Sequence, residues 1–169
     1  MHYYVDGYNV MHKATELRPL VRQSFLAARE ALIEKVAQFC VATGTPVTLV
    51  FDGQAKHTAE HSVHEHVGGL RIVYAPANST ADAVIERTVY QAAAKLETVV
   101  VSNDRSVREV CRNMGAIVIE ADNFLTTLRE AKRDTQALIN HTQRVETSVL
   151  EERLDARSIE ALKTLRDKL

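Results

Sequence analysis

Residues 2–10 read HYYVDGYNV, and this stretch predicts how the rest of the chain is arranged. Residues 2–6 are typical of a short buried strand that ends in an acid, Asp6. Gly7 gives the backbone freedom to turn sharply just after that acid. A carboxylate at the carboxyl end of a strand lies at the edge where open α/β sheets bind ligands. The stretch therefore predicts a ligand-binding edge that includes Asp6.

Strand-like and helix-like segments alternate over most of the chain. Strands are predicted at residues 2–6, 47–51, 70–75, 98–101 and 116–119, and helices at residues 24–42, from 79 onward, at 106–114 and from about 123 onward. Residues 7–23 are predicted to be a polar connection. Strands such as 47–51 are apolar on both faces, as in a parallel sheet covered by helices on both sides. We therefore predict an α/β fold with a parallel sheet.

Length and composition narrow the class of protein. The chain has 169 residues, of which 46% are hydrophobic and 25% charged, and this excludes intrinsic disorder and favours one domain with a terminal extension. The net charge of −1 excludes a polycation, so any contact with nucleic acid must come from a local patch.

The two cysteines and the apolar runs predict a cytoplasmic protein. Cys40 and Cys111 fall in helix-like stretches and are expected to be reduced thiols in the core. No apolar run approaches the length of a membrane span, and no signal peptide opens the chain.

The last forty or so residues differ from the rest, because no strand is predicted after residue 125. A patchy helical stripe is formed by Leu150, Leu154, Ile159, Leu162 and Leu165. We expect a globular domain at residues 1–130 and a helical extension at 131–169. The extension could pack on the domain, a partner or a second copy of the chain, or it could contact RNA. Its mixed acids and bases weaken the RNA interpretation.

Acids recur where the predicted strands end. Asp6, Asp52 and Asp104 follow three strands, and Asp82 lies in the first turn of the helix that follows the third strand. Right-handed crossovers place such strand ends on one edge of a parallel sheet, so these carboxylates could converge. Converging carboxylates repel one another unless a cation neutralises them or one holds a proton. Their hard oxygen ligands suit Mg²⁺ or Mn²⁺, which can activate a water against a phosphodiester.

Each acid also has a structural interpretation. Asp6 and Asp52 precede glycines and could simply form turns. Ser79 and Asp82 could form a capping box, and Asp104 could cap the helix that follows it. Glu86, one helical turn after Asp82, could extend the cluster or pair with a basic neighbour.

Several polar side chains near these acids are candidates for contacts with a substrate. Asn9 could orient Asp6 or a phosphate, and Ser102 and Asn103 could bond Asp104 or the scissile phosphate. The remaining candidates are Arg87 and Arg105 for phosphate oxygens, Tyr8 for stacking on a base, and Asp122 as a further ligand. Surface salt bridges explain either arginine equally well, and a helix cap is the favoured role of Asp122.

A histidine-rich stretch spans residues 54–68. Its members are His57, His61, His64 and His66. No cysteine or nearby Asp completes a zinc pattern, which favours a loop near the substrate that becomes partly cationic at mildly acidic pH.

At this point the residues resemble a known family. The motifs that carry the resemblance are Val5-Asp6-Gly7-Tyr8-Asn9-Val10, Ala28-Arg29 with Leu32-Ile33, Val50-Phe51-Asp52, Thr80-Ala81-Asp82 with Ile85-Glu86, and Ser102-Asn103-Asp104-Arg105. Their order and spacing over roughly residues 3–130 are similar to those of the YacP-like branch of the NYN domain family, relatives of the PIN-domain nucleases. Gly53 and Asn103 depart from the residues expected there, and neither the histidine-rich stretch nor Asp122 has a clear counterpart.

The resemblance implies a three-layer α/β/α PIN-like fold with about five, mostly parallel strands. It also implies a Mg²⁺- or Mn²⁺-dependent endoribonuclease in which Asp6, Asp82 and Asp104 hold the metal, supported by Asn9, Asp52, Glu86 and Asn103. The implied substrate is single-stranded RNA, which could be messenger RNA on ribosomes.

Two rival functions stay open. The chain could be an RNA- or ribosome-binding module without turnover, which RNA binding in EDTA without cleavage would indicate. It could also be another α/β phosphoryl enzyme, but Tyr8 replaces the second Asp of a haloacid-type phosphatase and no Lys follows the fifth strand as in a receiver domain.

Overall fold

The computed structural model of the protein describes residues 1–53, 63–65, 68–76 and 78–153. The chain divides into two compact units, Met1–Lys132 and Arg133–Leu169. In the described residues, no helix combines the length and the apolar character needed to cross a membrane.

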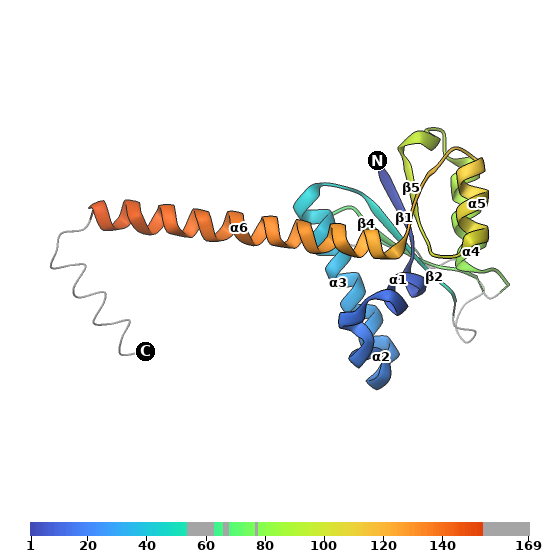
Figure 1. Cartoon of the computed structure of the whole chain (residues 1–169), viewed down its shortest axis with the longest axis horizontal. Helices are drawn as coiled ribbons and strands as arrows, with labels where there is room; N and C mark the ends of the chain where they lie inside the picture. Colours follow the sequence, from blue (N-terminus) through green and yellow to red (C-terminus); the bar gives the residue numbers. More distant parts are fainter. Residues whose placement is uncertain (54–62, 66–67, 77, 154–169) are drawn as a thin grey trace. The chain divides into compact units, whose positions relative to one another are not determined.

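The first unit alternates strands and helices, as predicted (Figure 1). The strands are β1 His2–Asp6, β2 Val47–Phe51, β3 Val63–Glu65, β4 Leu70–Tyr74, β5 Thr98–Val101 and β6 Ile117–Ile119. The α-helices are α1 Gly7–Lys13, α2 Arg18–Gln23, α3 Phe25–Thr43, α4 Ala81–Gln91, α5 Arg105–Asn113 and α6 Ala121–Arg153, and two short 3₁₀ helices lie at Thr15–Leu17 and Lys95–Glu97.

The strands form one sheet in the order β3-β4-β2-β1-β5-β6. All neighbours are parallel except β3, which pairs with β4 antiparallel. The chain builds outward from β1 through β2 to β4, and then returns to the other side of β1 to form β5 and β6. The strand order therefore reverses between β1 and β5, and the carboxyl ends of these two strands flank the crevice where open α/β sheets bind ligands. The predicted α/β fold with a mostly parallel sheet is confirmed.

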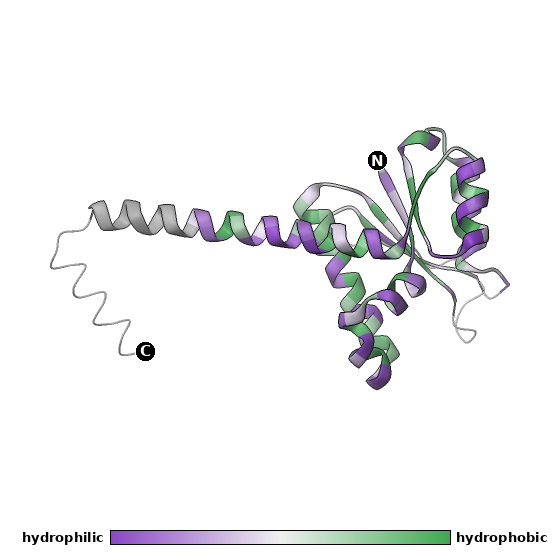
Figure 2. Ribbon diagram, viewed as in Figure 1, coloured by the Kyte–Doolittle hydropathy of each residue, from purple (hydrophilic) through white to green (hydrophobic). Residues whose placement is uncertain are grey.

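Helices cover both faces of the sheet, and each face has its own apolar core. Alternate side chains of the strands, including Leu49 and Phe51, pack with α1, α3 and the first turns of α6. The intervening side chains, including Val50 and Val100, pack with α4 and α5. Hydrophobic residues accordingly run along the central strands and α3 (Figure 2). These are the three layers of the predicted α/β/α arrangement.

Helix ends follow local capping rules. The Ser24 side chain accepts a hydrogen bond from the Ala27 N–H and begins α3, and Gly44, with φ of 67°, ends it. Thr80 caps α4 by accepting from the Ala83 N–H, so the expected capping box between Ser79 and Asp82 is wrong. The reason is that the residue that caps the helix is Thr80, one position after Ser79.

Three expectations about connections are corrected. Residues 7–23 are not an irregular connection: they hold α1, a 3₁₀ turn and α2, and Pro19 is tolerated because it lies in the first turn of α2. The histidine-rich stretch contributes β3 as a sixth strand, with His64 within it. The other three histidines, His57, His61 and His66, lie outside the described residues. The last helix begins at Ala121, so Asp122 lies in its first turn and does not cap it.

Cys40 on α3 and Cys111 on α5 are both buried and unpaired, as predicted. Burial is the main cause that raises the pKa of Cys111 to about 11, which makes it a poor nucleophile at neutral pH. In the second unit the described residues are helical, and Leu138 and Ile139 are exposed. Most of the predicted apolar stripe of this unit, from Leu154 onward, lies outside the described residues.

Candidate active site

Asp6 ends β1 beside the reversal of strand order, with only 9% of its surface exposed. Its Oδ1 accepts a hydrogen bond of 3.0 Å from the Asn9 N–H, so it also caps α1. Burial is the largest cause that raises the pKa of Asp6 to about 6, and the charges of Asp82 and Asp52 add to it against the effect of that hydrogen bond. A buried carboxylate that faces two other acids favours a cation or a proton at this position.

Gly7 allows α1 to begin directly after Asp6. A Cβ atom at this position would lie 2.2 Å from Cε1 of Phe51, and the ring is held in the core. The Asp6-Gly7 pair is therefore more than a turn signal, because the glycine lets the first turn of α1 pack against the end of β2.

Asp82 lies in the first turn of α4 and is half-buried. Burial first, and then the charges of Asp104, Asp52 and Glu86, raise its pKa. Together with the coupling of Asp6 to Asp82 and Asp52, this places five acids within electrostatic reach of one another. We call Asp6, Asp52, Asp82, Glu86 and Asp104 the carboxylate cluster. The predicted convergence of acids from different strand ends is thus present in the fold.

Asp52 and Asp104 are exposed, and backbone N–H groups hold them in place. Asp52 Oδ1 accepts from the Ala81 N–H at 2.7 Å, which ties the end of β2 to the start of α4. Asp104 Oδ1 accepts from the N–H groups of Ser106 and Val107 at 2.7 and 3.2 Å and caps α5. These contacts confirm the cap expected of Asp104, and each uses one carboxylate oxygen. The other oxygen of each acid has no hydrogen bond from the described residues and can face a ligand.

The two asparagines position the loop that carries Asp104. Asn9 Oδ1 accepts from the Asn103 N–H at 3.1 Å, and Asn103 Oδ1 accepts from the Ala121 N–H at 2.9 Å. The Ser102 hydroxyl accepts from the Asp104 N–H at 3.0 Å. The sequence suggested that Asn9 orients Asp6 and that Asn103 bonds Asp104. Asn9 does bond Asp6, through its backbone N–H, whereas the Asn103 side chain bonds Ala121 in place of Asp104.

The remaining candidates lie in different surroundings. Arg87 and Arg105 are exposed, and the described residues supply neither with an ion pair, so the surface salt bridges considered for them are not seen there. Tyr8 packs between Phe25 and Phe51, with centroid distances of 5.0 Å to each ring. Its hydroxyl is buried without a hydrogen-bond partner among the described residues. Tyr8 is therefore a partly buried residue that packs against the core, and this placement counts against the expected stacking on a base.

The donor set of the carboxylate cluster matches a hard divalent cation in chemistry. The Asp82 carboxylate accepts no hydrogen bond and makes no ion pair within the described residues, so its oxygens are available. In the same residues, no three His, Cys, Asp or Glu side chains are close enough together to hold an ion directly. Mg²⁺ typically keeps several waters and takes only one or two carboxylates, with substrate phosphates completing its shell. The arrangement fits that mode of binding and does not fit a closed all-protein cage.

Comparisons with known proteins agree with this fold. The family model of the YacP-like NYN domain matches residues 3–167 of this chain. YacP of Bacillus subtilis (strain 168) is 35% identical over 83 residues, a match that spans 49% of this chain and 48% of that protein. The chain therefore matches about half the length of this relative.

The solved structures cover more of the chain. A crystal structure of Rae1 (YacP) from Bacillus subtilis superposes with a TM-score of 0.71 and 26% identity, covering 98% of this chain and 92% of that one. A mutant of the same protein gives a TM-score of 0.66 over 97% of this chain and 92% of that one, also with 26% identity.

Proposed function

The chain belongs to the YacP-like NYN domain family, and from this premise we propose that it is a metal-dependent endoribonuclease that hydrolyses RNA at the carboxylate cluster. The observation that carries the proposal is the gathering of five acids from different elements beside the reversal of strand order. Such a cluster is costly without a cation, and a protein that only bound RNA would gain nothing from carboxylates facing phosphates.

In the proposed site, Asp6, Asp82 and Asp104 would hold Mg²⁺ or Mn²⁺. When bound, the ion neutralises the acids, activates a water and stabilises the charge that develops on the phosphate. Asp52 and Glu86 add negative charge around Asp82, and the fixed positions of Asp52 and Asp104 keep the cluster from relaxing apart.

The surrounding residues have separate tasks. Asn9 and Asn103 hold the loop that carries Asp104. In the proposed site, the exposed guanidinium groups of Arg87 and Arg105 bind phosphate oxygens. In-line attack of water on phosphorus breaks the P–O3′ bond and leaves a 5′-phosphate and a 3′-hydroxyl. The substrate class is single-stranded RNA, and messenger RNA on ribosomes is the presentation that the family suggests.

The test uses purified protein with structured and unstructured RNA, and with translating ribosomes, in Mn²⁺, Mg²⁺ or EDTA. We expect internal cuts that need the cation, leave a 5′-phosphate on the downstream fragment and vanish in Asp104→Asn. Because asparagine is also a good helix cap, this variant should keep the thermal unfolding midpoint of the wild type. RNA binding that persists in EDTA, without cleavage on either substrate, would instead make the protein a binding module.

A further inference from the structure

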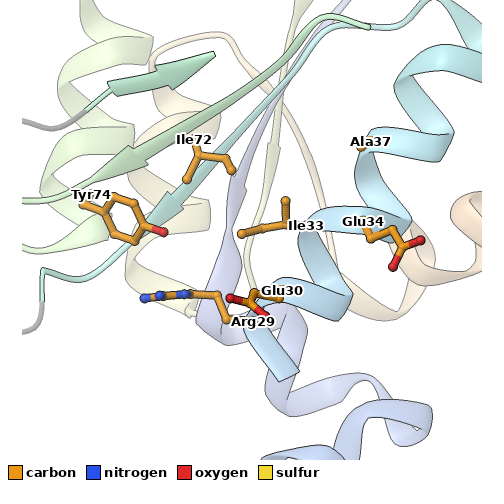
Figure 3. Close-up of a pocket in the computed structure, with 7 residues that line it drawn as sticks. All are labelled: Arg29, Glu30, Ile33, Glu34, Ala37, Ile72 and Tyr74. Carbon is orange, nitrogen blue, oxygen red and sulfur yellow. The ribbon is translucent and has the colours of Figure 1, made fainter. Parts of the chain in front are cut away.

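A second site lies on the opposite face of the sheet from α4 and α5, between α3 and β4. It is a pocket of about 520 Å³, drawn in Figure 3. This volume falls in the range of pockets that hold small organic groups. The carboxylate cluster does not contribute to its lining.

The pocket has an apolar floor and a charged rim. Ile33 and Ala37 of α3 and Ile72 of β4 form the floor, and Ile33 and Ile72 point toward one another in Figure 3. Arg29 and Glu30, both at the start of α3, lie side by side at the rim. A flat, partly apolar group with polar edges matches this lining better than a compact ion does.

Arg29 is held in the pocket by an aromatic ring. Its guanidinium carbon lies 5.2 Å from the centroid of the Tyr74 ring. Within the described residues, its buried Nε has no hydrogen-bond partner and Arg29 forms no ion pair. A buried N–H that lacks an acceptor costs free energy, so a ligand that brings an acceptor to Arg29 recovers that cost.

The two acids of the rim determine which charge the pocket favours in a ligand. Glu30 and Glu34 both line the pocket, so its formal charge with Arg29 is negative. Glu34 accepts a hydrogen bond from the Gln38 side chain at 3.3 Å, whereas Glu30 has no such partner among the described residues. The acids disfavour a phosphate and leave the Glu30 carboxylate as an acceptor for ligand N–H groups.

The backbone at the ends of β2 and β4 connects the pocket to the edge of the sheet that carries the carboxylate cluster. The Phe51 ring stacks on the Tyr74 ring with centroids 5.8 Å apart, and Asp52 follows Phe51 directly. The Ala75 N–H bonds the Phe51 carbonyl oxygen at 2.8 Å. A Cβ at Gly53 would lie 2.1 Å from the Ala75 carbonyl oxygen. No side chain can therefore stand at Gly53, beside the acid that ends β2.

We infer that this pocket, lined by Arg29, Glu30 and Tyr74, binds an unpaired nucleobase of the RNA strand whose backbone lies at the carboxylate cluster. The Arg29 guanidinium, backed by the Tyr74 ring, donates to an acceptor on the edge of the base. Glu30 accepts from the base N–H groups, and Ile33, Ala37 and Ile72 cover the ring. This inference rests on the proposed function for the identity of the ligand as RNA.

The binding test uses the four uncharged nucleosides, since they cannot be held by a cation at the carboxylate cluster. The full chain is titrated with each nucleoside, and the NMR signals of the Arg29 Nε–H and the Tyr74 ring are followed. We expect saturable shifts of both signals in the wild type. The affinity, followed at the Tyr74 ring in every variant, should fall about tenfold in Arg29→Gln and in Ala37→Leu, which fills the floor. Arg22→Gln, which removes an exposed charge of α2, should bind like the wild type.

The same variants are then compared for RNA cleavage. Arg29→Gln should raise KM about tenfold with kcat nearly unchanged, because the base is bound equally before and during the reaction. A protein that cuts RNA but shows no nucleoside shifts, or that binds nucleosides as tightly in Arg29→Gln and Ala37→Leu as in the wild type, would overturn this inference and leave the nuclease intact. A protein that binds nucleosides at Arg29 but cuts no RNA would overturn only the nuclease.

Discussion

The carboxylate cluster and the Arg29 pocket use opposite faces of one sheet, and they differ in how each is built. The cluster consists of acids at strand ends and in the first turn of a helix, held by backbone N–H groups and facing one another. The pocket consists of side chains from within α3 and β4, with a single cation stacked on an aromatic ring. One region has unneutralised negative charge, and the other has a buried donor to which the described part of the chain brings no acceptor. The difference suggests that the two regions recognise different parts of the same strand, phosphate and base.

The largest expected effect comes from removing one acid from the carboxylate cluster. Asp82→Asn should lower kcat/KM for RNA by about 100- to 1,000-fold, the range seen when one preorganised charge-stabilising group is lost. Glu109→Gln, which neutralises an exposed acid of α5 outside the cluster, should cut RNA like the wild type. Equal rates for both variants would show that Asp82 has no part in the chemistry.

The next test disturbs the packing of the Phe51 ring, a contact that both regions share. Gly7→Ala places a methyl group where the Phe51 ring lies, and Phe51 in turn stacks on Tyr74. We expect a loss of about 2 kcal/mol in the free energy of unfolding by urea, as is usual for overpacking. Gly44→Ala is the matched control: its Cβ meets open space, so only the strain of a positive φ remains, about 1 kcal/mol. A larger loss at Gly44 than at Gly7 would contradict this account.

The acids should also make stability depend on pH in the metal-free protein. The pKa of Asp6 is raised from 3.8 to about 6, so the folded state keeps a proton that the unfolded state releases between these values. The stabilising contribution is therefore complete below about pH 4 and is lost as the pH rises through about 6.

Asp6→Asn measures this effect. In EDTA at about pH 8 the variant should be more stable than the wild type by about 1–2 kcal/mol, because the buried charge is gone although a charge-assisted hydrogen bond to Asn9 is weakened. The gain should disappear near pH 4. Thermal unfolding at both pH values, followed by circular dichroism, provides the comparison, and a gain that does not change with pH would exclude this origin.

The carboxylate cluster could be predicted from sequence, because local sequence patterns place its acids at or just after strand ends. A parallel sheet carries every strand end to one edge, so Asp6, Asp52 and Asp104 could be placed together without knowledge of any contact. The hydrogen bond from Asn103 to Asn9 spans 94 positions and left no local signal. The helix that begins at Gly7 was missed for the opposite reason, because Asp-Gly is a strong local turn signal that the packing on Phe51 overrides.

The pocket could not be predicted from sequence, because it depends on contacts between residues that are far apart in the chain. Arg29 lies in a helix whose charged residues looked solvated, and the ring that holds it, Tyr74, lies at the end of a strand far along the chain. Only the placement of α3 over β4 brings these side chains together. A charged residue on a helix can be assigned to solvent or to a site only after tertiary structure is known.

The smallest expected effect concerns which base the pocket prefers. Guanine offers two adjacent N–H donors on one edge and two acceptors on another, and so matches Glu30 and Arg29 together, whereas uracil offers one such donor. Glu30→Gln keeps the size of the side chain but replaces one acceptor oxygen by a donor. We expect guanosine to bind the wild type about fivefold more tightly than uridine, and the variant to lose this preference while uridine binding barely changes. The matched control is Glu34→Gln, because Glu34 already bonds Gln38 and should not contact the base. Loss of the preference in Glu34→Gln alone would place the base on the other side of the pocket, nearer Ala37 than Arg29.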